Sequence, residues 1–310
     1  MPVFVGAGTS SFMKSSGGLG FSRVSTSTRN GLTAVEGQVI YNTDSNVLEY
    51  YNGSDWAKIS AVLAVLNSVS GNIAAGLATN LSLSGEGFLQ SGLVVNFTQS
   101  ADSINVNVTV TPSSDTAASV AVPASVYNNV TAGRAVTIKV TNSDGSTSQG
   151  VNKTAVALPS GGSIQTYSGY RSHTFNSSGT FTATALISQV DALIVAGGGG
   201  GGADNSGGGG AGGMLVQTNV PVSAQGYTIT IGGGGSGAYQ SHGDGGPYAV
   251  NGSNTTAFGY TAIGGGRGGS AGGANATSGG SGGGGAGEAA SPTGGAGTSG
   301  GAGGGAGAAG

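Results

Sequence analysis

Glycine is so unevenly distributed along this chain that it divides the sequence into two unlike parts. Of the 67 glycines among the 310 residues, 47 lie in residues 197–310. Glycine loses more conformational freedom on folding than any other residue, so a long glycine run is ordered only where close backbone packing compensates. The change of composition near Ala196 therefore marks a boundary between two differently built parts of the chain.

Charged side chains are scarce, at 7% of residues with a net charge of −3, where an ordinary soluble domain has about 25%. Phosphate-backbone binding needs a basic face, so we expect no nucleic-acid partner. Cysteine is absent, which excludes disulfides and thiolate metal sites. No window approaches 18 uninterrupted apolar residues, and residues 1–5 do not begin a signal peptide. We therefore expect cytoplasmic synthesis and no membrane insertion.

Residues 1–60 are predicted to form a β-meander that attaches the chain to its assembly. The strand-like runs are Gln38–Tyr41, Val47–Tyr51 and Trp56–Ile59, and the turn dipeptide Asn52-Gly53 separates the last two. Three short strands need a partner surface to be stable, and a second copy of the chain could supply it.

Residues 61–80 are expected to be a linker or a short helix. Their apolar residues, among them Leu66, Val69 and Ile73, are spaced much as on one helix face, although Gly71 and Gly76 weaken a helix.

Residues 81–165 show the period-two alternation of strands with one buried face. Turn residues at 112–115, 142–145 and 159–162 separate the strand-like runs, which indicates an antiparallel sandwich. The runs are Leu93–Phe97, Ile104–Val110, Ser119–Val122, Ala135–Val140 and Thr154–Leu158.

This segment resembles the immunoglobulin-like IPT/TIG domains. The resemblance rests on Gly85–Phe88, Val94–Phe97, Ser113–Thr116, Val120–Pro123 and Ile138–Gly145. It implies an immunoglobulin-like fold and is nearly silent about function, because such domains serve mostly as spacers or binding scaffolds.

Residues 168–310 are predicted to form a glycine-rich domain in which strands alternate with glycine runs. A disordered linker is the alternative that composition favours. Apolar strands between the runs, recurring aromatics and the lack of charge argue for order through residue 269. Glycine segments can form left-handed extended helices with three residues per turn and pack side by side, which we expect here.

The glycine-rich part resembles the glycine-rich domain of phage tail fibres, and it is similar in kind to polyglycine tip adhesins. The matching stretches are His173–Phe181, Val190–Gly200, Gly208–Gly213, Tyr227–Gly233 and Phe258–Gly266. Such domains commonly close with a hydrophobic strand, whereas this sequence stops at Ala308–Gly310, so we expect a truncated or disordered C-terminal end. Residues 37–56 resemble a segment of phage virion proteins, notably those of cyanophages.

Catalytic chemistry is not evident, so we expect no enzyme, no cofactor and no metal site. Catalysis needs a nucleophile, base or metal cluster at close quarters. His173 and His242 lie far apart in the sequence, and neither belongs to a nucleophile pattern. Asp204 and Asp244 lack the regular spacing of calcium repeats.

Side chains between the glycine runs are the candidates for receptor contact, because the connecting loops carry the side chains that such an array can expose at its surface. Tyrosine rings can stack on sugars through their apolar faces. The candidate receptor-facing residues are Asn205, Tyr239, His242, Asp244, Tyr248 and Arg267.

The sequence predicts an all-β chain, and the resemblances imply a virion protein of a tailed phage, a trimeric fibre or tail adhesin made in the host cytoplasm. Its expected partners are other virion proteins, through the N-terminal region, and a host-surface glycan or outer-membrane protein. A capsid decoration protein, head fibre or knob is the first alternative. A bacterial surface adhesin and an ice-binding protein are the others.

Overall fold

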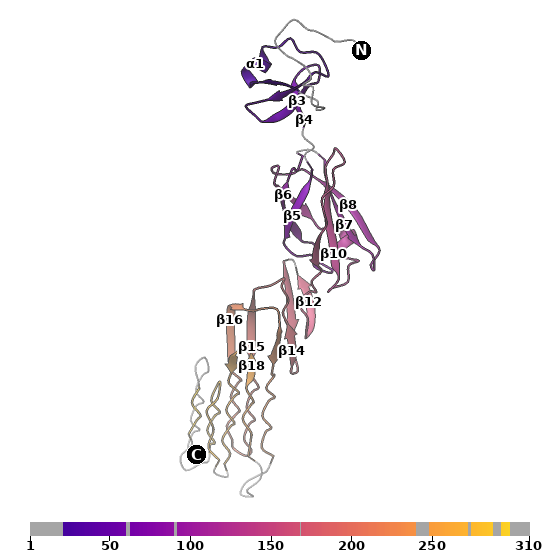
Figure 1. Cartoon of the computed structure of the whole chain (residues 1–310). Coiled ribbons are helices and arrows are strands. Elements are labelled where there is room, and N and C mark those ends of the chain that lie inside the picture. The colour runs from indigo at the N-terminus through magenta and orange to yellow at the C-terminus, as the bar shows by residue number, and fades with distance from the viewer. Residues whose placement is uncertain are drawn as a thin grey trace.

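The computed structural model describes residues 21–59, 63–89, 92–167, 169–239, 248–271, 274–287 and 293–297. Its secondary structure is almost entirely β, which confirms the predicted fold class. The molecule is elongated, with an N-terminal sheet at one end, a sandwich in the middle and glycine segments at the other end (Figure 1).

The N-terminal sheet has four strands in sequence order. β1 runs parallel to β2, and the remaining neighbours are antiparallel. The predicted three-strand meander is present as β2–β4, whereas β1 and helix α1 were not predicted. The elements are β1 (Ser22–Val24), α1 (Thr26–Asn30), β2 (Val39–Asn42), β3 (Val47–Tyr51) and β4 (Trp56–Ile59).

The middle of the chain forms a two-sheet antiparallel sandwich. One sheet has the order β5-β6-β9 and the other β11-β10-β7-β8. Alternating apolar side chains from both sheets fill one core, which includes Leu81, Phe97 and Ile138. The elements are β5 (Val65–Ser70), β6 (Asn80–Glu86), β7 (Leu93–Gln99), β8 (Ile104–Val110), β9 (Ala117–Ala121), α2 (Ala124–Tyr127), β10 (Ala135–Thr141) and β11 (Val151–Thr154).

The expected linker or short helix over residues 61–80 is wrong in its secondary structure, because β5 lies inside that range. The register of β5 against β6 shifts between Leu66 and Ser68, so the strand has a bulge there. The buried positions become Leu66 and Val69, and this three-residue spacing imitates one face of a helix.

The last strand of the sandwich also lies earlier than expected. β11 ends at Thr154. Of the expected strand 154–158, the residues beyond Thr154 form one β-bridge in the described part of the chain, between Val156 and Ala74.

Four two-stranded sheets begin the glycine-rich part. Three of them surround a small apolar core that contains Phe181, Ile194 and Ile229, which we call the anchoring core. The antiparallel pairs are β12 (Ser163–Tyr167) with β13 (Tyr170–Thr174), β14 (Gly179–Thr182) with β17 (Gly226–Ile229), β15 (Gln189–Val195) with β16 (Met214–Pro221), and β18 (Thr255–Ala257) with β19 (Tyr260–Ala262).

Beyond the anchoring core the chain runs back and forth in extended glycine segments, which we call the glycine array (Figure 1). Along segment 196–202 the hydrogen-bonded neighbours repeat every third residue. Residues 197 and 200 donate to segment 248–254, residues 199 and 202 donate to segment 207–213, and residues 198 and 201 accept from segment 232–238. A three-residue repeat is the period of the left-handed extended helix that the sequence predicted.

Candidate functional site

The glycine array admits side chains only at certain positions. A Cβ added to Gly200 would lie 2.0 Å from the carbonyl oxygen of Ser236, whereas one added to Gly201 would have no neighbour closer than 4.0 Å. A Cβ added to Gly198 would also have room, because its nearest neighbour, the Gly210 carbonyl oxygen, would lie at 3.6 Å. Positions that face a neighbouring segment must therefore be glycine. Side chains that could bind a ligand are confined to outward-facing positions and to the loops.

Two candidate residues lie where array segments end. Asn205 occupies the turn between segments 196–202 and 207–213, with φ +26°, and its carbonyl accepts from the Gly287 N–H at 2.7 Å. Tyr239 follows Ala238, whose N–H donates to the Gly201 carbonyl, and its side chain is 77% exposed. Both residues lie at the end of the array that is distant from the anchoring core.

The structure brings two other candidates together. The Arg267 guanidinium carbon lies 5.7 Å from the centroid of the Tyr248 ring, within the range of a cation–π contact. Tyr248 keeps 44% of its surface exposed. Nε of Arg267 is buried and has no hydrogen-bond partner within the described part of the chain. His242 and Asp244 lie outside the described residues.

Sequence reasoning missed two asparagines on the segment that follows Tyr248. Asn251 Oδ1 accepts from the backbone N–H of Arg267 at 2.9 Å, and Asn254 Oδ1 accepts from the backbone N–H of Gly264 at 2.8 Å. Both the acceptors and the donors are three residues apart, which is one turn of the glycine helix. Polar residues spaced by three would have been the signal. Thr277 joins the group, because its Oγ1 also accepts from the backbone N–H of Arg267, at 3.0 Å.

The array thus offers tyrosine rings, a guanidinium and amide groups on a backbone held by hydrogen bonds. Such groups can stack on an apolar ring face and hydrogen-bond to hydroxyl or carboxylate groups. The described residues contain no group of three His, Asp or Glu side chains that could hold a metal ion. No helix of the described segments has the length and hydrophobicity to span a membrane.

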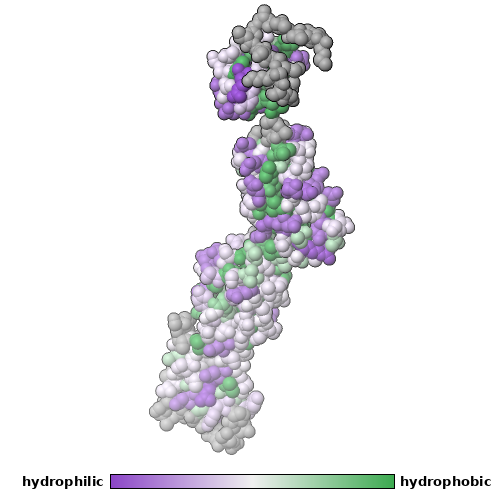
Figure 2. Space-filling view, in the orientation of Figure 1, coloured by the Kyte–Doolittle hydropathy of each residue, from purple (hydrophilic) through white to green (hydrophobic). Residues whose placement is uncertain are grey.

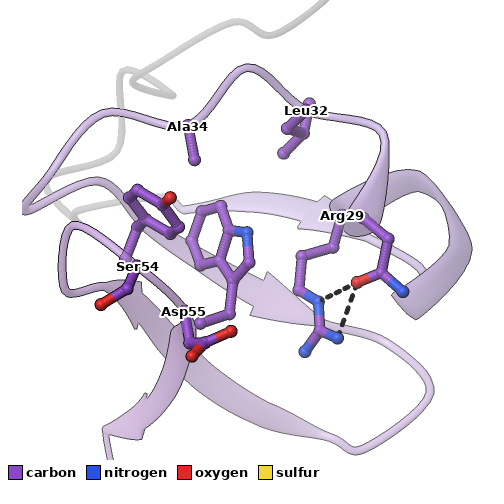
Figure 3. A pocket seen from close by; sticks show the side chains of 8 residues that line it. Arg29, Leu32, Ala34, Ser54 and Asp55 are labelled. Carbon is purple, nitrogen blue, oxygen red and sulfur yellow. Dashed lines mark hydrogen bonds between the residues drawn. The ribbon is translucent and has the colours of Figure 1, made fainter.

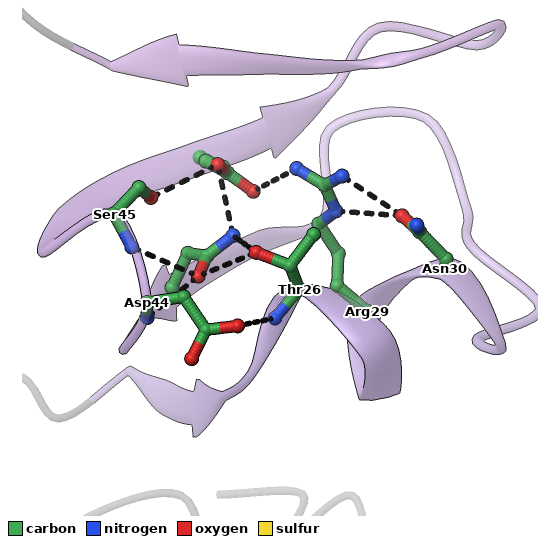
Figure 4. Close-up of polar contacts among 7 residues, drawn as sticks. Thr26, Arg29, Asn30, Asp44 and Ser45 are labelled. Atoms are coloured by element: carbon green, nitrogen blue, oxygen red, sulfur yellow. Dashed lines mark hydrogen bonds and ion pairs between the residues drawn. The ribbon is translucent and has the colours of Figure 1, made fainter.

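A buried polar network holds the N-terminal sheet together (Figure 4). Glu49 is only 2% exposed. Its carboxylate accepts from Arg29 Nη1 at 2.8 Å and from Asn42 Nδ2 at 3.1 Å. Burial acts to raise the pKa of Glu49, but the hydrogen bonds from Arg29 and Asn42, together with the Arg29 charge, hold that pKa below its ordinary value.

Glu49→Gln is expected to destabilise the N-terminal sheet by about 3 kcal/mol at neutral pH, because it leaves Arg29 without its buried partner. A lowered folded-state pKa contributes stability above the unfolded value, about 4.3, and this stability is lost as pH falls through the folded value. The deficit of the variant should therefore shrink below about pH 4. Urea unfolding followed by fluorescence of Trp56, the chain's single tryptophan, reports on this sheet.

The exposed Glu36→Gln is the matched control and should leave the unfolding midpoint unchanged. Equal midpoints for wild type and Glu49→Gln at pH 7 would contradict the stabilising role of the network.

Next to this network the N-terminal sheet has a shallow hollow (Figure 3). Tyr51 and Trp56 form its aromatic wall, with ring centroids 5.5 Å apart, and Leu32 and Ala34 line it on the other side. The same loop exposes 70% of Val35. Exposed apolar groups on a small sheet are typical of a contact surface.

Two family models match the chain. Residues 9–75 match the phage tail like trimerisation region, which includes the N-terminal sheet and β5. Residues 173–310 match the glycine-rich domain, which includes the anchoring core and the array. The searches of curated proteins and of solved structures gave no match. The trimerisation match indicates a homotrimer, and the two matches together support a phage tail fibre-like structural role for this chain as a component of the virion.

Proposed function

We propose that the chain is a non-enzymatic tail adhesin that attaches to other virion proteins through its N-terminal region and presents the distal loops of the glycine array to the host surface. The order of the parts carries this proposal. The trimerisation match lies at one end of an elongated molecule, and the array loops lie at the other end (Figure 1).

The chemistry of the distal loops favours a glycan or the polar loops of an outer-membrane protein as the receptor. Tyr239 and Tyr248 are exposed rings, and Arg267 lies beside the second of them. Because the array positions these groups on a backbone held by hydrogen bonds, little ordering cost remains to be met on binding.

The sandwich fits the role of a spacer between the two ends. Its two antiparallel sheets, with orders β5-β6-β9 and β11-β10-β7-β8, support an immunoglobulin-like fold. A capsid decoration protein is the competing function, and the match to a phage tail like trimerisation region favours the tail.

Phage that carry Tyr239→Ala together with Tyr248→Ala are expected to adsorb to host cells at least about tenfold more slowly, since each exposed ring in a binding site contributes about 1–2 kcal/mol. The control is Asn107→Ala, an exposed residue on the sandwich. Adsorption rates are compared on particles whose content of the chain is verified by immunoblot. An unchanged rate on intact particles would remove the receptor-binding role of the distal loops.

A further inference from the structure

One face of the β15–β16 sheet is apolar and exposed. Leu193 lies opposite Val216, and Val195 lies opposite Met214. These four side chains expose between 52% and 66% of their surfaces, and apolar surface is visible in this part of the molecule (Figure 2). Four large apolar side chains in two adjacent cross-strand pairs form a continuous patch, which we call the aliphatic patch. Patches of this kind mark contact sites.

The β12–β13 hairpin presents a second exposed surface. Every residue of β12 is exposed, and a two-stranded hairpin is marginally stable by itself. One of its faces touches its own chain, because the His173 ring meets Phe181 edge-on at 5.0 Å. Tyr167 and Tyr170 pair across the strands on the opposite face and are 58% and 76% exposed. This tyrosine face points away from the anchoring core.

The two sheets that carry these surfaces lie at a similar level along the molecule (Figure 1). Among the labelled strands of the glycine-rich part, Figure 1 shows β16 toward the left and β12 toward the right, with β15 and β14 between them. In a parallel trimer the copies share one long axis, so surfaces at the same level along that axis lie next to each other. Threefold rotation about that axis allows a surface on one side of each copy to meet a surface on the other side of the next.

We propose that the tyrosine face of β12–β13 packs on the aliphatic patch of the neighbouring copy in the trimer. A contact between two different surfaces closes into a ring when the rotation between copies is threefold, and each copy then uses both of its surfaces. Tyrosine rings lie well on aliphatic side chains, and the Met214 sulfur is a favourable neighbour for an aromatic ring. This inference rests on the homotrimer, but it does not require host binding.

The absence of cysteine from the chain makes a direct test available. The double variant Tyr170→Cys/Val216→Cys is expected to form disulfides between chains, seen as dimer and trimer bands on a non-reducing gel that disappear on reduction. The control pair Tyr170→Cys/Asn107→Cys combines the same hairpin position with an exposed residue of the sandwich and should stay monomeric on the gel.

Three results would overturn the proposal. The first is a trimer in light scattering that forms no interchain disulfide in the double variant. The second is interchain linkage in Tyr170→Cys alone, because the hairpins would then contact each other. The third is a monomer in light scattering, which removes the trimer itself and leaves the adsorption experiment as an independent test of host binding.

Discussion

Replacing Gly200 with alanine is expected to disrupt the glycine array and to cost about 3 kcal/mol or more. The N–H of Gly200 donates to the Val250 carbonyl, and its carbonyl accepts from the Gly268 N–H. A methyl group on its α-carbon would lie 2.0 Å from the Ser236 oxygen. Overpacking a core costs about 1–3 kcal/mol when side chains can adjust, but here the neighbour is backbone, and moving it breaks further hydrogen bonds.

Gly201→Ala is the matched control, one residue further along the chain. Its Cβ would have no neighbour closer than 4.0 Å. Alanine restricts the unfolded chain more than glycine does, so this variant should be neutral or stabilised by about 0.5 kcal/mol. Hydrogen exchange over residues 197–213 distinguishes the two variants. Similar protection in both would show that three-residue packing does not order the array.

Removing the ring of Phe181 is expected to release the array from the rest of the molecule. Phe181 is 4% exposed at the centre of the anchoring core, where its ring meets those of His173 and Phe258 at 5.0 and 5.7 Å. A buried Phe→Ala change costs about 3–5 kcal/mol. The array itself has few apolar side chains to bury, so this loss falls on the main hydrophobic contribution to its stability.

Phe97→Ala makes the same chemical change in the core of the sandwich, where Phe97 is fully buried. We expect calorimetry to show a lower unfolding temperature for the sandwich in this variant and an unchanged unfolding temperature for the glycine-rich part. Phe181→Ala should give the reverse. Equal shifts of both transitions in either variant would mean that the two cores unfold as one.

The strands that the sequence predicted best are those with one buried face. β7 and β10 alternate buried and less buried residues along most of their length, and this period is visible in the sequence itself. The bulge in β5 interrupts this alternation of buried and exposed residues. β12 lacks the alternation, because all its residues are exposed. Helix α1 spans only five residues, too few for a helical pattern to be recognised.

The candidate site was predictable as a set of loop residues but not as a geometry. Tyr248 and Arg267 were selected separately, and the array places them in contact although they are far apart in the sequence. Asn251 and Thr277 were missed because their role depends on which glycine segments lie side by side. Composition alone cannot determine that neighbour relation.

Immunogold electron microscopy of intact virions, with an antibody against residues 197–270, tests whether the glycine array is the host-facing end of a tail adhesin. We expect gold particles at the tips of tail fibres, where the glycine array would meet the host. Label distributed over the capsid would rule out the tail adhesin and would favour a decoration protein.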